Sequence, residues 1–245
     1  MYKIATFFVF LLFLSPLAHA QYQRQNWWAL GYDFTQIKIN ELKSTEIGHI
    51  PTLDLELGVS FSPTTAFAIR GVYGENSLTF QGTTLNGIQV DQLATVRKFD
   101  LRGDVIYMFT EYFFNIGYAT RNLYDSVPQQ PSRDSQIHFL PIGVTYWAYP
   151  YYLKAEYRRW LSAEENVKAS ELGGGRQDVS LKQNDGNGYS FEVGYLIQRP
   201  LGVKLSLQWE HWHVDGSNSQ NDFVENLSEP DQTITETTLG LGLIF

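Results

Sequence analysis

The C-terminal stretch TETTLGLGLIF, residues 235–245, alternates between two kinds of side chain. Leu239, Leu241, Leu243 and Phe245 occupy every second position, and threonine, glycine or isoleucine lies between them. Successive side chains of a β-strand point to opposite faces, so this period of two predicts a strand with one apolar face. An unpaired apolar strand promotes aggregation, and closing a sheet into a barrel is one way to pair it. A buried last strand in a soluble sheet would show the same pattern.

The first 20 residues predict export from the cytoplasm. They contain Lys3, an apolar run over residues 4–14 and the sequence Ala18-His19-Ala20, in the order of a secretory signal peptide. We expect cleavage after Ala20, leaving one β-barrel domain over residues 21–245. The chain contains no cysteine, so neither a lipid anchor at the cleavage site nor a disulfide framework is expected.

The composition excludes several classes of function. The formal net charge is −8, and removal of Lys3 makes it −9, which argues against a nucleic-acid partner. After residue 20 no apolar segment reaches the ~18 residues of a membrane helix. The aromatic content of 15% fits a secreted β-sandwich. It also fits a membrane β-barrel, whose alternating strands give no strong hydropathy peak.

Strand-period alternation recurs along the whole chain. It predicts ten strands, over residues 28–35, 53–61, 66–80, 99–109, 112–121, 140–146, 151–158, 189–198, 201–210 and 235–245. Short turns are expected at residues 62–65, 110–111, 148–150 and 199–202. Longer polar links are expected at residues 40–51, 81–95, 122–135, 162–188 and 214–232. This sorting is typical of an antiparallel up-and-down transmembrane barrel with short periplasmic turns and longer extracellular loops.

The polar faces of these strands predict a charged lumen. Charges are costly in the dry centre of a sandwich, whereas in a barrel they can pair with one another and with water. Aromatic residues gather toward both ends of the strands, as in the interfacial girdles of membrane barrels. The predicted lumen charge network comprises Asp33, Asp54, Glu56, Arg70, Asp100, Arg102, Asp104, Arg121, Lys154, Glu156, Arg158, Glu192, Lys204, Glu210 and Glu236.

The signal peptide, the ten amphipathic strands and the closing segment over residues 238–245 together resemble the small outer-membrane β-barrel proteins of Gram-negative bacteria. This porin-like or outer-membrane protein A-type resemblance implies an all-β barrel surrounded by membrane lipid and lipopolysaccharide. It implies that Leu239, Leu241, Leu243 and Phe245 are an assembly signal for the barrel-assembly machinery. No cofactor or metal is implied, and we expect a monomer.

The charged lumen and the acidic links are two candidate sites for a function. A network of charges with Met108 and Phe113 is expected to fill the bore as a packed polar core, which favours a structural or surface-interaction role. An open bore would instead form a narrow channel, with cation preference because acids outnumber bases. The acid-rich links 162–188 and 214–232 favour either simple solubility or recruitment of divalent cations or a basic partner.

The third candidate is the sequence EHWHVD, residues 210–215. His213 and Asp215 are two apart on a strand and point to one side, so the aspartate could orient the histidine as a general base. This group and the strand number resemble the omptin proteases, which implies a rim hydrolase. The chain is shorter than the omptin pattern, however, and lacks a facing acidic pair, so we expect no enzyme. Metal binding at this group is another possibility, with the ligands His211, His213 and Asp215. A further interpretation is an interfacial belt of Trp209, His211 and Trp212.

Overall fold

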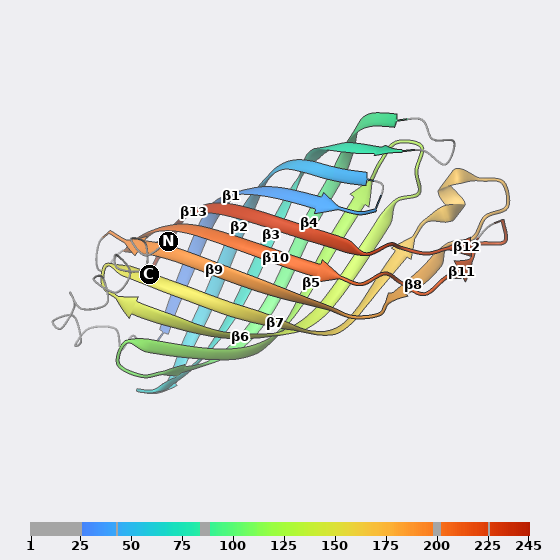
Figure 1. Cartoon of the computed structure of the whole chain (residues 1–245). Helices are drawn as coiled ribbons and strands as arrows, with labels where there is room; N and C mark the ends of the chain where they lie inside the picture. The colour runs from blue at the N-terminus through green and yellow to red at the C-terminus, as the bar shows by residue number, and fades with distance from the viewer. Residues whose placement is uncertain (1–25, 43, 84–88, 198–201, 225) are drawn as a thin grey trace, which may run out of the picture.

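Ten long antiparallel strands form a closed barrel (Figure 1). The computed structural model describes residues 26–42, 44–83, 89–197, 202–224 and 226–245, so the expected signal peptide lies outside the described residues. The barrel strands are β1 (Asn26–Asn40), β2 (Ser44–Ser62), β3 (Thr65–Thr83), β4 (Gln89–Met108), β5 (Tyr112–Ser126), β6 (Arg133–Ala148), β7 (Tyr151–Val167), β9 (Gly186–Leu196), β10 (Gly202–Val214) and β13 (Gln232–Ile244).

The C-terminal strand closes the barrel. β13 pairs with β1, where Leu243 is opposite Leu30, and with β10, where Leu241 is opposite Leu205. Pairing of β6 with β7 completes the ring on the far side. The Trp28 and Phe245 rings stack at the seam, with centroids 3.7 Å apart. The prediction that this stretch pairs with the first strand and with the ninth barrel strand is therefore confirmed.

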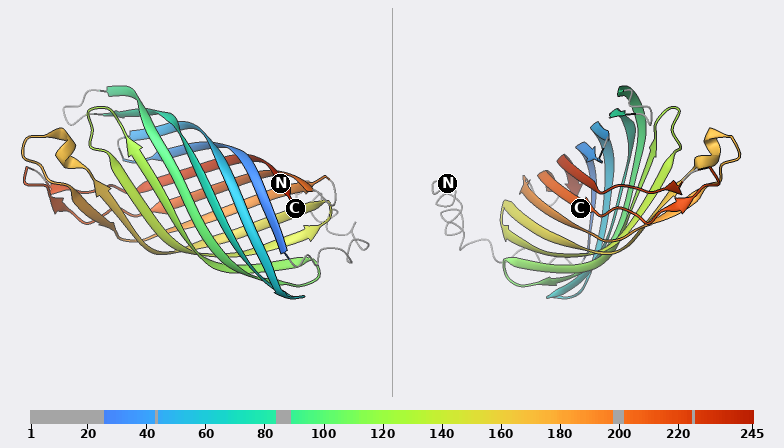
Figure 2. Two further views of the ribbon diagram at one scale, coloured as in Figure 1. Left: turned by 180° about the vertical axis from the view of Figure 1, so that it is seen from behind. Right: turned by 45° about the vertical axis from the view of Figure 1, so that its right-hand side comes forward.

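Two of the expected links contain ordered structure that projects beyond the ring (Figure 2). β7 pairs with β9 along its first half and with the short strand β8 (Val179–Gln183) along its second half. The helical turn η1 (Ala169–Leu172) joins β7 to β8, and the strands β11 (Gln220–Asn221) and β12 (Asn226–Leu227) form a small hairpin. We call this projection, residues 162–185, 215–224 and 226–231, the loop arm. No helix in the described ranges is long and apolar enough to cross a membrane.

The two faces of the barrel exchange polarity about halfway along the strands. We call the end of the barrel with the short turns, such as residues 62–65 and 110–111, the turn end, and the opposite end the loop end. On β1 the outward side chains are apolar up to Phe34 and polar from Gln36, whereas the inward side chains change from Asp33 to Ile37. The β1–β13 register runs through this point without a bulge, so the inversion comes from the sequence and leaves the backbone regular. Buried inward residues of the loop-end half include Ile50, Leu78, Val96, Leu123, Ile137 and Ile234.

The outer surface of the turn-end half is an apolar belt. On β2 it extends from Phe61 to Leu53, eight residue steps or roughly 26 Å along the strand at about 3.3 Å per residue. Its exposed side chains include Trp28, Leu30, Tyr32, Phe34, Leu53, Leu55, Leu57, Phe61, Ile69, Tyr73, Phe99, Leu101, Val105, Phe114, Ile116, Tyr118, Ile142, Phe191, Val193, Leu207, Leu239 and Leu241.

The polarity inversion also corrects the expected strand bounds. Most of the links predicted at 40–51, 81–95 and 122–135 is strand, since β2 begins at Ser44, β4 at Gln89 and β6 at Arg133. In these segments most outward residues are polar and the inward residues include Ile50, Val96 and Leu123, opposite to the turn-end half. A polar stretch that follows an apolar belt resembles a loop in sequence, although its period of two is retained.

Candidate functional site

An apolar plug fills the loop-end half of the bore. Trp212 of β10 is completely buried, and its ring meets Phe139 of β6 edge to face, with centroids 4.8 Å apart. Trp160 of β7 also belongs to this cluster, beside Gly186, where a Cβ atom would lie 2.7 Å from the indole. The plug is continuous with the inward isoleucine, leucine and valine side chains of the loop-end half.

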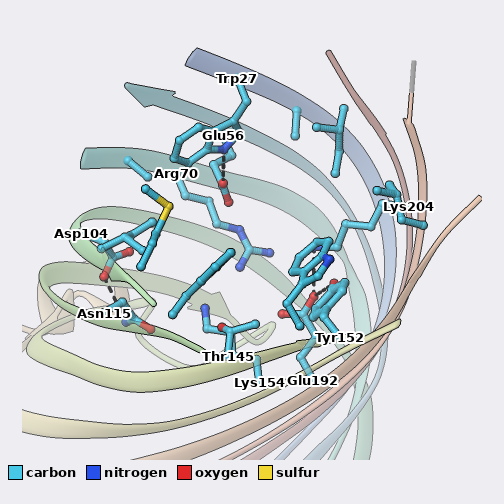
Figure 3. A pocket seen from close by; sticks show the side chains of 18 of the residues that line it. Trp27, Glu56, Arg70, Asp104, Asn115, Thr145, Tyr152, Lys154, Glu192 and Lys204 are labelled. Atoms are coloured by element: carbon cyan, nitrogen blue, oxygen red, sulfur yellow. Dashed lines mark hydrogen bonds and ion pairs between the residues drawn. The ribbon is translucent and has the colours of Figure 1, made fainter. Parts of the chain in front are cut away.

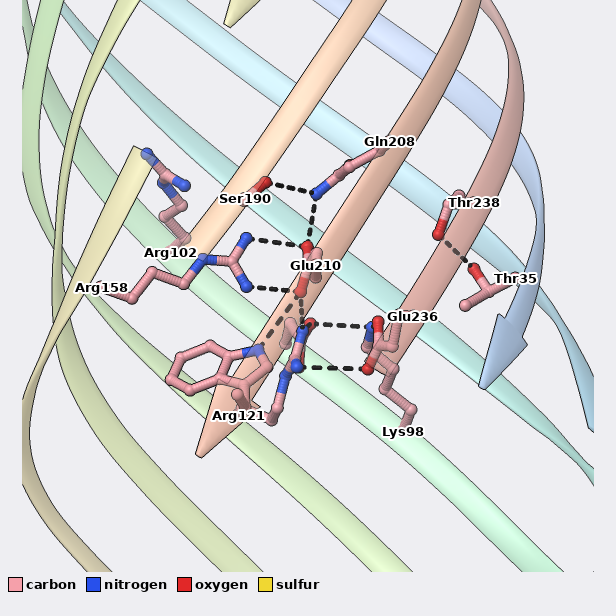
Figure 4. Close-up of polar contacts among 12 residues, drawn as sticks. Thr35, Lys98, Arg102, Arg121, Arg158, Ser190, Gln208, Glu210, Glu236 and Thr238 are labelled. Carbon is pink, nitrogen blue, oxygen red and sulfur yellow. Dashed lines mark hydrogen bonds and ion pairs between the residues drawn. The ribbon is translucent and has the colours of Figure 1, made fainter. Parts of the chain in front are cut away.

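Beneath the plug, a chain of alternating charges crosses the bore (Figure 4). We call it the charge chain. Arg158 donates from Nη2 to Oε1 of Glu210 at 2.8 Å, and Arg121 donates from Nη2 to Oε2 of the same carboxylate at 2.9 Å. Because Arg121 is on β5 and Glu210 on β10, four positions apart in the ten-stranded ring, their contact spans the bore. In spatial order its members are Asp104, Arg102, Glu156, Arg158, Glu210, Arg121, then Asp100 and Glu236, and finally Lys98.

The charge chain is bound directly to the plug. Arg121 and Arg158 both lie over the Trp212 ring, at 5.0 and 5.1 Å from its centroid. Arg158 also lies 5.6 Å from the centroid of the Phe139 ring. Guanidinium groups are favourable above aromatic rings, because the ring face carries negative charge. The plug is therefore in direct contact with Arg121 and Arg158, the two central cations of the charge chain.

A chamber of about 610 Å³ occupies the turn-end half of the bore (Figure 3). Its walls combine charged side chains with aromatic ones, such as Trp27, whose Nε1 donates to Oε1 of Glu56 at 2.7 Å. Arg70 reaches into the hollow and donates from Nη2 to Oδ2 of Asp54 at 2.7 Å. Lys204 lies 3.0 Å from Oε1 of Glu192. These contacts hold the charged groups against the walls.

All of the predicted lumen residues have inward positions, and all except Asp33 belong to two groups that meet at the Lys154–Glu156 ion pair. Asp100, Arg102, Asp104, Arg121, Glu156, Arg158, Glu210 and Glu236 form the charge chain, which Lys98 completes. Asp54, Glu56, Arg70, Lys154, Glu192 and Lys204 lie around the chamber. Asp33 is buried beside Gly240, where a Cβ atom would lie 2.6 Å from Oδ1 of the carboxylate.

The expectation of a packed polar core throughout the bore is wrong. The charges fill one layer, an apolar plug lies on its loop side, and a hollow lies on its turn side. Met108 and Phe113, expected to help fill the bore, line the chamber. Ala29, Ala68 and Gly202 are also among the lining residues, and their small side chains leave the space open.

A second polar group, the Arg133 cluster, lies at the loop end above the plug. Arg133 of β6 donates from Nη1 to Glu41 at 2.9 Å and to Glu229 at 3.2 Å, and from Nη2 to Asp125 at 3.1 Å. Carboxylate oxygens of Glu46 and Glu165 lie 3.7 and 4.0 Å from the same guanidinium. One guanidinium, only 15% exposed, thus faces five carboxyl groups among the described residues.

Burial makes this excess of carboxyl groups hold protons. It raises the pKa of Glu46 to about 9, with Asp125 nearby adding to the rise, and raises the pKa of Glu165 to about 8. Burial also raises the pKa of Asp125 and of Glu229 above their ordinary values. Desolvation and neighbouring like charge both disfavour an ionised carboxylate. Protons bound here therefore stabilise the folded loop end.

We expect the barrel to lose stability as the pH rises from about 5 to about 9, because the folded state binds more protons than the unfolded state between the ordinary and the raised pKa. Replacing Glu46 and Glu165 by Gln should flatten this dependence and raise the free energy of unfolding near pH 9 by about 1 kcal/mol or more, since one pKa unit corresponds to ~1.4 kcal/mol. Urea unfolding of the refolded protein measures both effects. Asp91→Asn, at an exposed outward position, is the matched control. If the wild type, the Glu46→Gln/Glu165→Gln variant and the Asp91→Asn variant all show the same pH dependence of stability, the prediction is contradicted.

The rim residues proposed for catalysis lie outside the bore. His213 Nε2 and Asp215 Oδ1 are 3.1 Å apart, so the structure brings the pair together, but their side chains are 43% and 47% exposed. His211 contacts Thr235 and stacks on Trp209 on the outer face. Among the described residues no group of three or more His, Cys, Asp or Glu is arranged to hold a metal ion. The assignment of Trp212 to an interfacial belt is wrong, because its side chain is inside the plug.

Comparison with known proteins adds little to this description. No model of a known protein family matches the chain, and the search of curated proteins found no match. The translocator domain of the autotransporter NalP from Neisseria meningitidis is 8% identical, with 98% of this chain and 95% of that chain covered and a TM-score of 0.46. Neisserial surface protein A is 13% identical, covering 89% and 95%, with a TM-score of 0.36. The Ail protein of Yersinia pestis is 8% identical, covering 91% and 100%, with a TM-score of 0.36. Similarity at this level identifies neither a relative nor an activity.

Proposed function

We propose that this chain is a monomeric β-barrel of the Gram-negative outer membrane, embedded in lipid through its apolar belt and adjoining lipopolysaccharide. The polarity inversion carries this proposal. The outward side chains of β2 are apolar over the nine residues from Leu53 to Phe61, and a tilted strand crosses a bilayer with ~9–11 residues. In water such a belt would be an aggregation surface. The C-terminal residues Leu239, Leu241, Leu243 and Phe245 then serve as the signal for the barrel-assembly machinery.

The bore is closed, and the protein serves a structural or surface-interaction role. The plug and the charge chain both lie across the bore, so a hydrated ion would have to break buried ion pairs and enter an apolar region. The loop arm is the part available for contacts outside the cell. Its β7–β8 hairpin has its own small core of Val167, Val179 and Leu181, with Leu227 packed against it.

We expect the refolded protein to show heat-modifiable gel migration and to produce no single-channel steps in a planar lipid bilayer. Folding into lipid follows from the belt, and electrical silence follows from the plug. A water-soluble monomer would contradict the membrane assignment. Reproducible conductance steps would contradict closure and favour the narrow cation-preferring channel instead.

The proposal includes no enzymatic activity. His213 and Asp215 are largely accessible to water, and their pairing lacks the desolvated surroundings that strengthen a general base pair. Hydrolysis of a peptide by the purified protein, lost on replacing His213 by Ala, would contradict this part of the proposal.

A further inference from the structure

The turn-end chamber has the size and position of a small-molecule site. Its 610 Å³ lies within the ~300–1,000 Å³ typical of ligand pockets. Many lining residues belong to the last or first positions of strands at the turn end, including Trp27 of β1, Met108 of β4, Phe113 of β5 and Trp147 of β6. The mouth is therefore at the turn end, and the charge chain forms the floor.

The walls near the mouth are aromatic. Phe113, Trp147 and Tyr152 form a stacked row, with successive centroids 6.0 and 5.1 Å apart. Trp27 lies on β1, five positions away from β6 in the ring, and so faces Trp147 across the bore. Ile106 and Met108 add apolar surface between them. An apolar body of a ligand would be desolvated on more than one side here.

Deeper in the chamber, three cations remain partly open to it. Arg70, Lys154 and Lys204 each contact a carboxylate, yet their side chains keep 20%, 22% and 24% of their exposure. In each pair the carboxylate is less exposed than the base, with Asp54 at 14%, Glu156 at 1% and Glu192 at 5%, so the charged groups that the hollow exposes most are cations. This arrangement favours a ligand with a negative charge.

We propose that the chamber binds a small carboxylate with an apolar body, which enters from the turn end with its carboxylate directed toward Arg70 and Lys154. Charge-assisted hydrogen bonds from a guanidinium or ammonium are the strongest that a carboxylate can accept. Lys154 is the clearest partner to test, because its own partner Glu156 is also held by Arg102 and Arg158. In the proposed orientation the mouth faces the periplasm, whereas binding itself requires only the folded barrel.

Equilibrium dialysis of 2-naphthoate against the barrel in phosphatidylcholine nanodiscs, with empty nanodiscs as the blank, tests this site. We expect saturable binding of one molecule per barrel, and affinity at least about tenfold weaker for the neutral 2-naphthamide, the ratio that corresponds to one charge-assisted contact. Competition by octanoate distinguishes an acyl from an aromatic ligand. No binding above the blank, or equal binding of acid and amide, would overturn the proposal.

Variants locate the binding within the bore. Lys154→Gln should weaken 2-naphthoate binding about tenfold, and Ala29→Phe should also weaken it by taking up part of the open volume of the chamber. Lys38→Gln removes one positive charge from the outer surface of β1 and should leave binding unchanged. Heat-modifiable migration of each variant confirms folding independently of ligand. Full retention of binding in both chamber variants would place the ligand elsewhere and overturn the proposal.

Discussion

Replacing Glu210 by Gln is expected to destabilise the barrel by about 3–5 kcal/mol, the usual cost of removing one partner from a buried ion pair. Glu210 is 6% exposed and accepts hydrogen bonds from Arg158 and Arg121. Without its negative charge, two buried guanidinium groups lie close together with less compensation. Arg121 keeps Asp100 and Glu236, and Arg158 keeps Glu156, so we expect a folded but weakened barrel.

The exposed pair Glu75–Arg97 provides a matched control. Its atoms approach to 2.9 Å, as in the buried pairs, but its side chains are 40% and 49% exposed. Replacing Glu75 by Gln should lower the free energy of unfolding far less than replacing Glu210, because exposed ion pairs are weak. Urea unfolding in lipid vesicles, followed by tryptophan fluorescence, compares the two variants. Equal losses would show that the charge chain contributes no more than a surface pair.

The alternation of side chains was sufficient to predict the barrel, its ten strands and its seam. Positions such as Glu56 and Glu192 could be assigned to the lumen because each lies between apolar neighbours that point outward. The contacts among them could not be predicted. Which inward residues meet across the bore depends on the stagger of strands that are far apart in sequence, as with Arg121 on β5 and Glu210 on β10. Alternation within one strand contains no information on that stagger.

The plug was missed because its residues were interpreted with the wrong phase. Ile37 and Ile39 follow the apolar belt of β1 but belong to the opposite face, so the change looks like the end of a strand. The sequence does contain evidence of the plug, because the alternation continues without a break while the apolar residues move from one set of alternate positions to the other. Arg133 was missed for the same reason, since the predicted strand starts at residue 140 whereas β6 begins seven residues earlier, at Arg133 itself.

Trp212 provides the second large effect. We expect Trp212→Ala to cost about 3–5 kcal/mol, the range for removing a buried aromatic side chain. The indole is fully buried, meets Phe139 and lies against two guanidinium groups, so its loss also removes the surface that supports Arg121 and Arg158. The double variant Phe139→Ala/Trp212→Ala should in addition produce conductance steps in planar bilayers. The cavity left by the two missing rings would connect the charge chain to the loop end and admit water into the bore there.

Trp209 on the same strand is the control for this experiment, because it has the same chemistry on the opposite face. Its side chain is 40% exposed, within the apolar belt, and stacks on Phe191 and His211. In lipid, Trp209→Ala leaves a gap that acyl chains can fill, so we expect a loss of no more than about 1 kcal/mol and continued electrical silence. If Trp209→Ala and Trp212→Ala lower the free energy of unfolding equally, the plug is not closely packed. If the double variant at Phe139 and Trp212 stays silent, the charge chain alone is sufficient to close the bore.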